Sequence, residues 1–242
     1  MAIERITGIV TDIVRYNDRH NIVGLYTRER GRISFLVPAT GGKGGRARNA
    51  RLQLLSAVES DVNFKENKSI QSLSKVGLKE VWRDIYFNPL KSALAIFIAE
   101  FLSRYLREAA PEPLLWDYIL ESLRILDNRK KHCANFHISF LIGMLHFAGI
   151  TPDISDIEPG DFFDMPSGHC VPEHPSHRSF LSPEETRVLP VLIRMNYTND
   201  RLFKFRGEER RRILNRILQY YAVHFPGMSS LRSPEILGEV FA

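Results

Sequence analysis

The chain has 242 residues, of which 44% are hydrophobic and 25% are charged, a composition typical of a soluble globular protein with room for one large or two smaller domains. It has no apolar run of the roughly 18 residues that a membrane span needs, and Glu4 falls where a secretory signal would be apolar. Its two cysteines, Cys133 and Cys170, exclude a disulfide framework and favour a reducing cytoplasm.

Positive charge is concentrated in the first third of the chain. Residues 1–78 hold 13 Lys/Arg and 7 Asp/Glu, a balance of +6, whereas residues 79–242 hold 20 and 21, a balance of −1. The net charge of +5 therefore comes entirely from the first 78 residues. This asymmetry indicates a basic module that meets nucleic acid, joined to a near-neutral scaffold.

The first 78 residues also have the pattern of β-strands. Apolar, β-branched residues alternate with polar ones in five stretches, at residues 3–14, 22–27, 33–37, 52–58 and 70–76. Turns are predicted at residues 16–18 and 28–31. Five short strands with one long loop fit a small barrel, for which the OB-fold is the leading candidate. Strand propensity alone leaves an SH3-like barrel open.

From about residue 79 the apolar period changes from two to 3.6 residues, which predicts helices. They are expected at residues 89–106, 116–126, 136–148, 183–194, 207–221 and 233–241. Five prolines between residues 151 and 181 make regular structure unlikely there. The predicted fold is therefore α+β: an OB-fold β-barrel at residues 1–78, then an all-helical domain at 79–242 with an irregular Pro-rich insert at 151–181.

The stretch from residue 27 to residue 51 is the candidate binding site. It runs as a strand to Pro38 and opens into a glycine-rich loop at residues 41–46, with seven Lys/Arg and one acid between Arg28 and Arg51. Glycine lets a backbone approach a ligand closely, and arginine suits phosphate oxygens and stacks on bases. The stretch therefore indicates a polyanion site, with a solvated, mobile surface loop as the alternative.

Motifs of catalysis are absent. The glycine-rich loop lacks the G-x-x-x-x-G-K spacing of a phosphate loop, since Val37 stands where the first glycine belongs and Gly44 follows Lys43. H-E-x-x-H and the nucleophile elbow G-x-S-x-G are also missing. We therefore expect no catalytic residues and no cofactor.

The sharpest metal candidate is the group His169, Cys170, His174 and His177. Cys and His with short gaps are soft-metal ligands in principle, but one cysteine stands where structural zinc sites usually have two to four. The alternative is an irregular loop whose histidines hydrogen-bond to backbone, and we expect no bound metal. Cys133 is interpreted as an inert thiol.

Short motifs in a common order along nearly the whole chain resemble the RecO family, the bacterial recombination-mediator proteins of the RecFOR pathway. The matching segments are Thr7-Gly8-Ile9-Val10, the turn at 16–18, T-R-E-R-G-R-I-S at 27–34, the basic loop with Leu52-Gln53-Leu54, G-I-T-P-D at 149–153, and Tyr220-Tyr-x-x-His-x-x-Gly227 with Leu231-x-Ser233. Each motif is weak alone, and their common order makes the match specific.

The resemblance implies a non-enzymatic role in DNA repair and recombination. RecO-like proteins bind single- and double-stranded DNA, anneal complementary strands, and engage RecR and the acidic C-terminal tail of the single-strand binding protein (SSB), which helps to load RecA onto coated DNA. It implies a bacterial cytoplasmic, nucleoid-associated protein without a membrane partner. Many members carry four cysteines in a zinc module after the segment that resembles residues 149–153. Here Ser155, Asp156 and their neighbours offer no first cysteine pair, so no zinc is expected.

On this interpretation basic residues of the barrel hold DNA phosphates, and binding should weaken steeply with salt. The candidates are Arg15, Arg19, Arg28, Arg32, Lys43, Arg46, Arg48 and Arg51. Tyr16 and Tyr26 are candidates either for base stacking or for the barrel core. The four arginines between 210 and 216 either extend the DNA track or form a solvated helix face.

An apolar pocket rimmed by Arg or Lys is expected for the SSB tail, with Arg124, Arg129 and Lys131 as candidates. The rival interpretations are a protein-interaction adaptor built on an OB-like barrel, and an RNA-binding protein without annealing activity.

Overall fold

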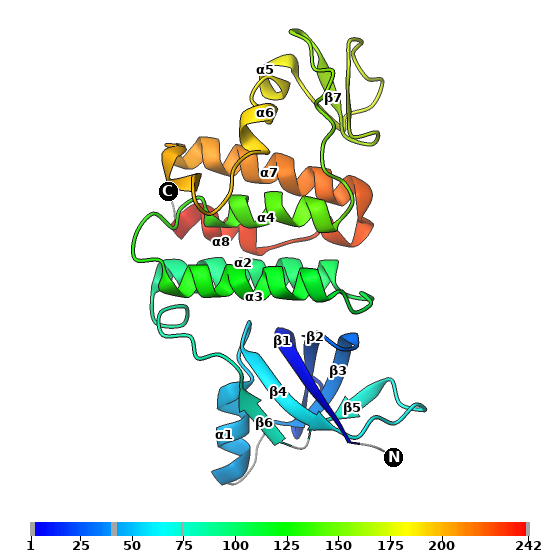
Figure 1. Cartoon of the computed structure of the whole chain (residues 1–242), viewed down its shortest axis with the longest axis vertical. Coiled ribbons are helices and arrows are strands. Elements are labelled where there is room, and N and C mark those ends of the chain that lie inside the picture. The colour runs from blue at the N-terminus through cyan, green and yellow to red at the C-terminus, as the bar shows by residue number, and fades with distance from the viewer. Residues whose placement is uncertain (1–2, 40–42, 74, 241–242) are drawn as a thin grey trace. The chain divides into compact units, whose positions relative to one another are not determined.

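The computed structural model describes residues 3–39, 43–73 and 75–240 (Figure 1). The chain divides into two compact units, Met1–Arg129 and Lys130–Ala242. The first unit contains the β-barrel together with two long helices, and the second contains further helices and a small sheet. Within the described residues no helix is both long and apolar enough to cross a membrane.

The first unit is built on a curled six-stranded sheet. Its strands are β1 (Glu4–Arg15), β2 (His20–Thr27), β3 (Gly31–Pro38), β4 (Ala57–Val62), β5 (Ile70–Ser72) and β6 (Lys75–Leu78), in the order β5-β3-β2-β1-β4-β6. Strand β5 pairs in parallel with β3 at one edge, while β6 pairs antiparallel with β4 at the other. Only two residues separate β5 from β6 in the chain, and the six strands curl into a half-barrel of the OB-fold type. This arrangement confirms the predicted OB-fold followed by helices.

Alternation of side chains places the core inside the barrel. On β2, Val23 and Leu25 point inward, and on β3, Phe35 and Val37 do the same; all four are at most 3% exposed. Successive side chains of a strand face opposite sides, so the residues between them face outward.

Two segments of the barrel differ from expectation. The fourth strand begins at Ala57 rather than Leu52, because Leu55 adopts a left-handed φ of 63° and donates its N–H to the Val10 carbonyl instead. The glycine-rich loop was expected at residues 41–46, yet the chain from Lys43 to Arg51 is helix α1, while residues 41 and 42 lie outside the described part. Gly44 and Gly45 lie in the first turn of this helix, and the alanines and arginines that follow them are strong helix formers.

The two long helices of this unit, α2 (Pro89–Tyr105) and α3 (Pro113–Asn128), confirm the predicted helical stripes. The Asn88 side chain caps α2 by accepting hydrogen bonds from the backbone N–H groups of Leu90 and Lys91. Helix α2 lies against β1, where the Ser103 hydroxyl is 3.2 Å from the Asp12 carboxylate. The barrel and these helices therefore belong to one compact unit.

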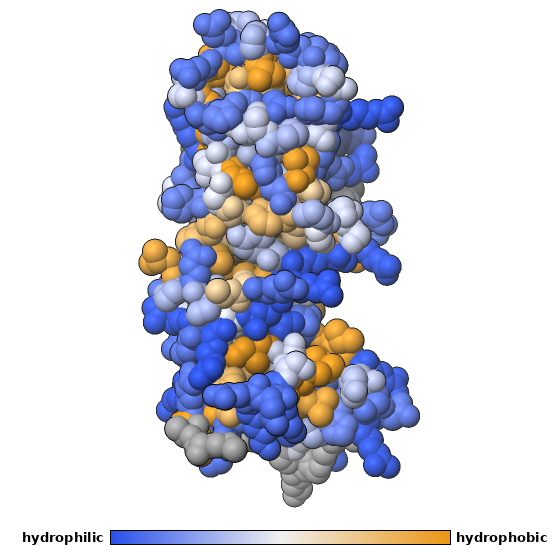
Figure 2. All heavy atoms as spheres, turned by 90° about the vertical axis from the view of Figure 1, so that its right-hand side faces the viewer, coloured by the Kyte–Doolittle hydropathy of each residue, from blue (hydrophilic) through white to orange (hydrophobic). Residues whose placement is uncertain are grey.

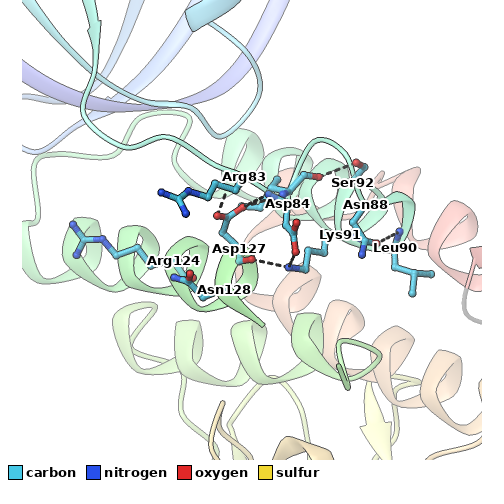
Figure 3. Close-up of polar contacts among 10 residues, drawn as sticks. Arg83, Asp84, Asn88, Leu90, Lys91, Ser92, Arg124, Asp127 and Asn128 are labelled. Atoms are coloured by element: carbon cyan, nitrogen blue, oxygen red, sulfur yellow. Dashed lines mark hydrogen bonds and ion pairs between the residues drawn. The ribbon is translucent and has the colours of Figure 1, made fainter. Parts of the chain in front are cut away.

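A buried polar cluster fixes the segment between barrel and helices (Figure 3). The Asp127 carboxylate, near the end of α3, accepts hydrogen bonds from the backbone N–H groups of Arg83, Asp84 and Ile85 at 2.8–3.0 Å. Lys91 is 1% exposed, and its ammonium lies 3.0 Å from the Asp84 carboxylate and 2.7 Å from the Asp127 carbonyl. Ionised acceptors make strong hydrogen bonds, so the residue 83–85 segment is held to α3.

The second unit contains helices and a three-stranded sheet. The helices are α4 (Phe136–Phe147), α5 (Pro183–Thr186), α6 (Leu189–Leu192), α7 (Gly207–His224) and α8 (Ser233–Val240), with 3-10 turns η1 (Asp200–Leu202) and η2 (Pro226–Met228). The helix expected at 183–194 is divided into α5 and α6, with Pro190 in the first turn of the second.

The Pro-rich segment 151–181 was expected to lack regular structure, and this was wrong in part. It contains β7 (Phe162–Asp164), β8 (His169–Val171) and β9 (Phe180–Leu181), in the order β8-β7-β9. The strands are two or three residues long and fall between the prolines, so proline density did not reveal them. On the surface, apolar patches interrupt hydrophilic side chains in both units (Figure 2).

Candidate nucleic-acid interface

One end of the barrel gathers most of the candidate basic residues. The turn between β1 and β2 lies beside the end of β3, since His20 pairs with Pro38 and the Ala39 N–H donates to the Arg19 carbonyl at 2.8 Å. Helix α1 is tied to the same place, because the Arg48 guanidinium and the Asn49 amide both donate to the Pro38 carbonyl. We call this the basic end, defined by residues 15–20, residues 38–39 and α1.

The arginines of the basic end are largely accessible. Arg15, Arg19, Arg46 and Arg51 are exposed and Arg48 is half-buried, while nothing is described of the Lys43 side chain. Arg15 pairs with Asp18 at 2.5 Å, but the two side chains are 75% and 92% exposed. An ion pair so exposed contributes little stability, so a phosphate can replace the carboxylate at small cost.

Two predicted site residues lie at the opposite end and have structural partners. Arg28 makes hydrogen bonds of 3.0 and 3.2 Å to the Asp117 carboxylate of α3, which raises the pKa of its guanidinium. Arg32 is 2.6 Å from Asp12, and its side chain is 11% exposed. This pair crosses the backbone of β2 at Gly24, where a Cβ atom would lie 2.0 Å from the Arg32 guanidinium. The structure does not bring Arg28 and Arg32 together with the basic end.

The outer face of β2 and β3 is partly covered by the chain itself. The connection between α2 and α3 lies over it: the Arg32 N–H donates to the Ala109 carbonyl at 3.0 Å and the Tyr26 hydroxyl to the Ala110 carbonyl at 3.4 Å. Tyr26 is 0% exposed, and burial raises its pKa to about 12. OB-folds often bind oligonucleotides on this face and on the β1–β2 loop. Here the α2–α3 connection covers Tyr26, which is therefore a core residue, whereas the β1–β2 turn remains accessible.

The histidines and Cys170 of the metal candidate are not brought together. Within the described ranges no cluster of three or more His, Cys, Asp or Glu is suited to a metal ion. His169 lies 3.4 Å from Asp153 and His177 lies 2.8 Å from Asp164. His174 instead contacts aromatic rings, with centroid distances of 5.1 Å to Phe162 and 4.7 Å to Phe180. These contacts link the short strands of the β7–β8–β9 sheet and its connections.

An apolar groove of about 810 Å³ lies in the second unit, between α7 and the α5–α6 segment. Helix α6 contributes no buried residue, and its Val191 is 57% exposed. Arg187 and Arg212 are exposed on the rim, as are Glu184 and Glu209. The sequence predicted a helix in the α6 region but not the groove beside it, because local periodicity does not reveal that no other element covers the apolar side chains of α6.

The arginines of α7 divide by role. Arg216 makes two hydrogen bonds to Glu185, at 2.8 and 3.1 Å. Arg210 donates to Asn135 at 3.0 Å and to the Phe205 carbonyl at 2.8 Å. Arg211 and Arg212 are exposed. Arg124, a candidate for the tail pocket, lies in the first unit and pairs with Glu80 and Glu121.

An OB-fold with a basic end, followed by helices, defines a class of protein suited to nucleic acids, and comparison with known proteins identifies the family. Residues 1–82 match the family described as recombination protein O N terminal, and residues 86–233 match recombination protein O C terminal. The chain belongs to the RecO family of DNA repair proteins.

Curated relatives cover nearly the whole chain. The chain is 36% identical over 240 residues to the DNA repair protein RecO of Phocaeicola vulgatus, which covers 99% of this chain and 100% of that protein. It is 36% identical to the DNA repair protein RecO of Bacteroides fragilis, with 99% of each chain covered. The corresponding protein of Porphyromonas gingivalis is 30% identical over 239 residues, with 97% of each chain covered. The family suggested by the sequence motifs is thus confirmed.

Proposed function

We propose that this chain binds single- and double-stranded DNA through the basic end and anneals complementary strands. The observation that carries the proposal is the convergence of the β1–β2 turn, the end of β3 and α1, which gathers exposed arginines from segments distant in sequence. Such a surface holds phosphates and reduces the repulsion between two strands without reading bases. The proposed role is to bind and position strands rather than to catalyse a reaction.

The basic end is tested by two double variants that remove the same charge from the same barrel. Arg19→Ala/Arg46→Ala acts at the basic end, whereas Arg5→Ala/Arg30→Ala removes exposed arginines that pair with Glu59 and Glu4 elsewhere. We expect the first variant to bind a labelled single-stranded oligonucleotide about 10-fold more weakly, with a log–log salt slope smaller by about 1.4, because each phosphate contact contributes roughly 0.7. The second should bind like wild type.

Strand annealing, measured with two complementary labelled oligonucleotides, should slow for the first variant alone. Equal binding by the two variants would show that the basic end is not the DNA site. Failure of the wild type to bind DNA would favour the adaptor interpretation, and a strong preference for RNA of the same sequence would favour the RNA-binding one.

The proposed partners are RecR and SSB, with which the chain would promote RecA loading on SSB-coated DNA. The apolar groove of the second unit fits the expected pocket for the acidic SSB tail better than the surroundings of Arg124 do. It offers uncovered apolar side chains on α6 and exposed arginines on its rim, whereas Arg124 has two acidic partners. The rim of the groove also carries acidic residues, among them Glu184, whose carboxylate accepts a hydrogen bond from the Ser182 hydroxyl.

Two neighbouring arginines of α7 test this placement. Arg212 lines the groove and Arg211 does not, although both are exposed. We expect Arg212→Glu to weaken binding of a labelled peptide that copies the SSB tail by about 10-fold, since it places like charges together, and Arg211→Glu to have little effect. Fluorescence anisotropy measures both. If Arg124→Ala weakens binding of the peptide while Arg212→Glu does not, the tail binds on the first unit instead.

A further inference from the structure

Tyr16 stands apart from the other large aromatic side chains that carry a polar group. The eight tyrosines and two tryptophans all fall within the described residues. Tyr16 is the one that is exposed, at 61%, while the others are buried or half-buried. Aromatic rings contribute most when they are covered, so the uncovered Tyr16 ring is available to stack on a ligand.

The turn that carries Tyr16 is held rigidly. The backbone N–H groups of Tyr16 and Asn17 both donate to the His20 carbonyl at 3.1 Å. The Asn17 side-chain oxygen in turn accepts from the N–H groups of Arg19 and His20, each at 2.9 Å. The ring is therefore presented on an ordered backbone, and binding does not have to pay for ordering the loop.

The surroundings of Tyr16 match a site for single strands. Arg15 and Arg19 flank it in the sequence and are exposed, and Val14 beside them is 55% exposed. The Arg19 carbonyl also joins this turn to Ala39, close to where α1 is tied. Cationic groups that follow a phosphate backbone, combined with an aromatic ring on which a base stacks, characterise proteins that bind unpaired nucleic acid.

We propose that Tyr16 stacks on an unpaired base of single-stranded DNA and gives the basic end a preference for single strands over duplex. The proposal rests on the proposed function, because the arginines of the basic end bring the strand to the ring. In a duplex each base is already stacked on its neighbours, so its face is not open to the tyrosine. Phosphates are present in both forms, so the arginines alone do not distinguish them.

The test uses the full chain with three labelled ligands: a 20-nucleotide thymidine strand, a strand of the same length with abasic sites throughout, and a 20-base-pair duplex. Tyr16→Ala should bind the thymidine strand about 10-fold more weakly and leave the other two affinities unchanged. Tyr16→Phe keeps the ring and should bind like wild type. Phe87→Ala, which removes another exposed ring (81% exposed) outside the basic end, should also bind like wild type.

Photo-crosslinking with 5-iododeoxyuridine in the strand should give a covalent adduct at Tyr16, located by mass spectrometry. The stacking proposal would be overturned if Tyr16→Ala lowered the affinity for all three ligands equally, or lowered the affinity for none of them. If Arg19→Ala/Arg46→Ala loses binding while Tyr16→Ala does not, stacking fails and the basic end stands. If both variants bind like wild type, the proposed function fails as well. Loss of binding to RecR without any change in DNA affinity would show that the ring contacts protein.

Discussion

Replacing Asp127 by alanine is expected to lower the free energy of unfolding of the first unit by about 3 kcal/mol or more, because three backbone N–H groups, of which that of Ile85 is buried, lose a charged acceptor worth roughly 1.5–3 kcal/mol each. Asp127 is 7% exposed, so water cannot take the place of its carboxylate without rearrangement. In this variant Lys91 would keep its ion pair with the Asp84 carboxylate. The loss of stability would therefore report on the hydrogen bonds that attach residues 83–85 to α3 (Figure 3).

Asp117→Ala is the matched control, since it removes another aspartate from the same helix. Asp117 pairs with Arg28, and these side chains are 50% and 46% exposed, so we expect a loss of about 1 kcal/mol or less. Urea unfolding followed by tryptophan fluorescence reports on this unit, because both tryptophans, Trp82 and Trp116, belong to it. Similar losses for the two variants would mean that the buried cluster does not fix the segment.

Replacing Gly31 by alanine should destabilise the same unit by about 3 kcal/mol, from left-handed backbone strain of roughly 1–2 kcal/mol and overpacking of roughly 1–3 kcal/mol. The residue has a φ of 70°, and a Cβ atom would lie 2.3 Å from the Ala109 carbonyl oxygen. The turn between β2 and β3 approaches the α2–α3 connection so closely that only glycine fits.

Gly149→Ala separates the two costs. Gly149 has a φ of 67°, and a Cβ atom added there would have no neighbour within 4 Å, so this variant should lose only the strain contribution. Thermal unfolding followed by circular dichroism, to which helices of both units contribute, compares them. If the two glycine variants lose equal stability, the α2–α3 connection moves aside easily and does not pack tightly on the barrel face.

Much of the fold was predictable because strands and helices bury one face at a regular period. Strand β3 and the helices α2, α3 and α7 carry such patterns, and the Asn88-Pro89 start was visible in the sequence. Strand β2 and helix α4 are buried on most sides and were visible as apolar stretches instead. Helix α1 has no apolar stripe, and its glycines indicated a loop. The short strands β7 to β9 were hidden among prolines.

The candidate site was only partly predictable, since charge counts identify basic segments but not their partners. Arg28 and Arg32 looked equivalent to Arg46 in sequence, yet Asp117 and Asp12 engage the first two. Tyr16 and Tyr26 were likewise indistinguishable, because the connection that covers Tyr26 lies more than eighty residues later in the chain. The DNA-binding residues and the domain boundary at residue 78 stay predictions.

The central position of β1 has a consequence for synthesis on the ribosome. This first strand lies inside the sheet and needs β4, which ends at Val62, as its second neighbour. The sheet is complete only once β6 has emerged and paired with β4, and residues 83–85 gain their acceptor only with Asp127. When only the barrel of a nascent chain has left the ribosome, residues 83–85 therefore still lack their hydrogen-bond acceptor. A fragment intended for isolated study of the barrel should extend to residue 129.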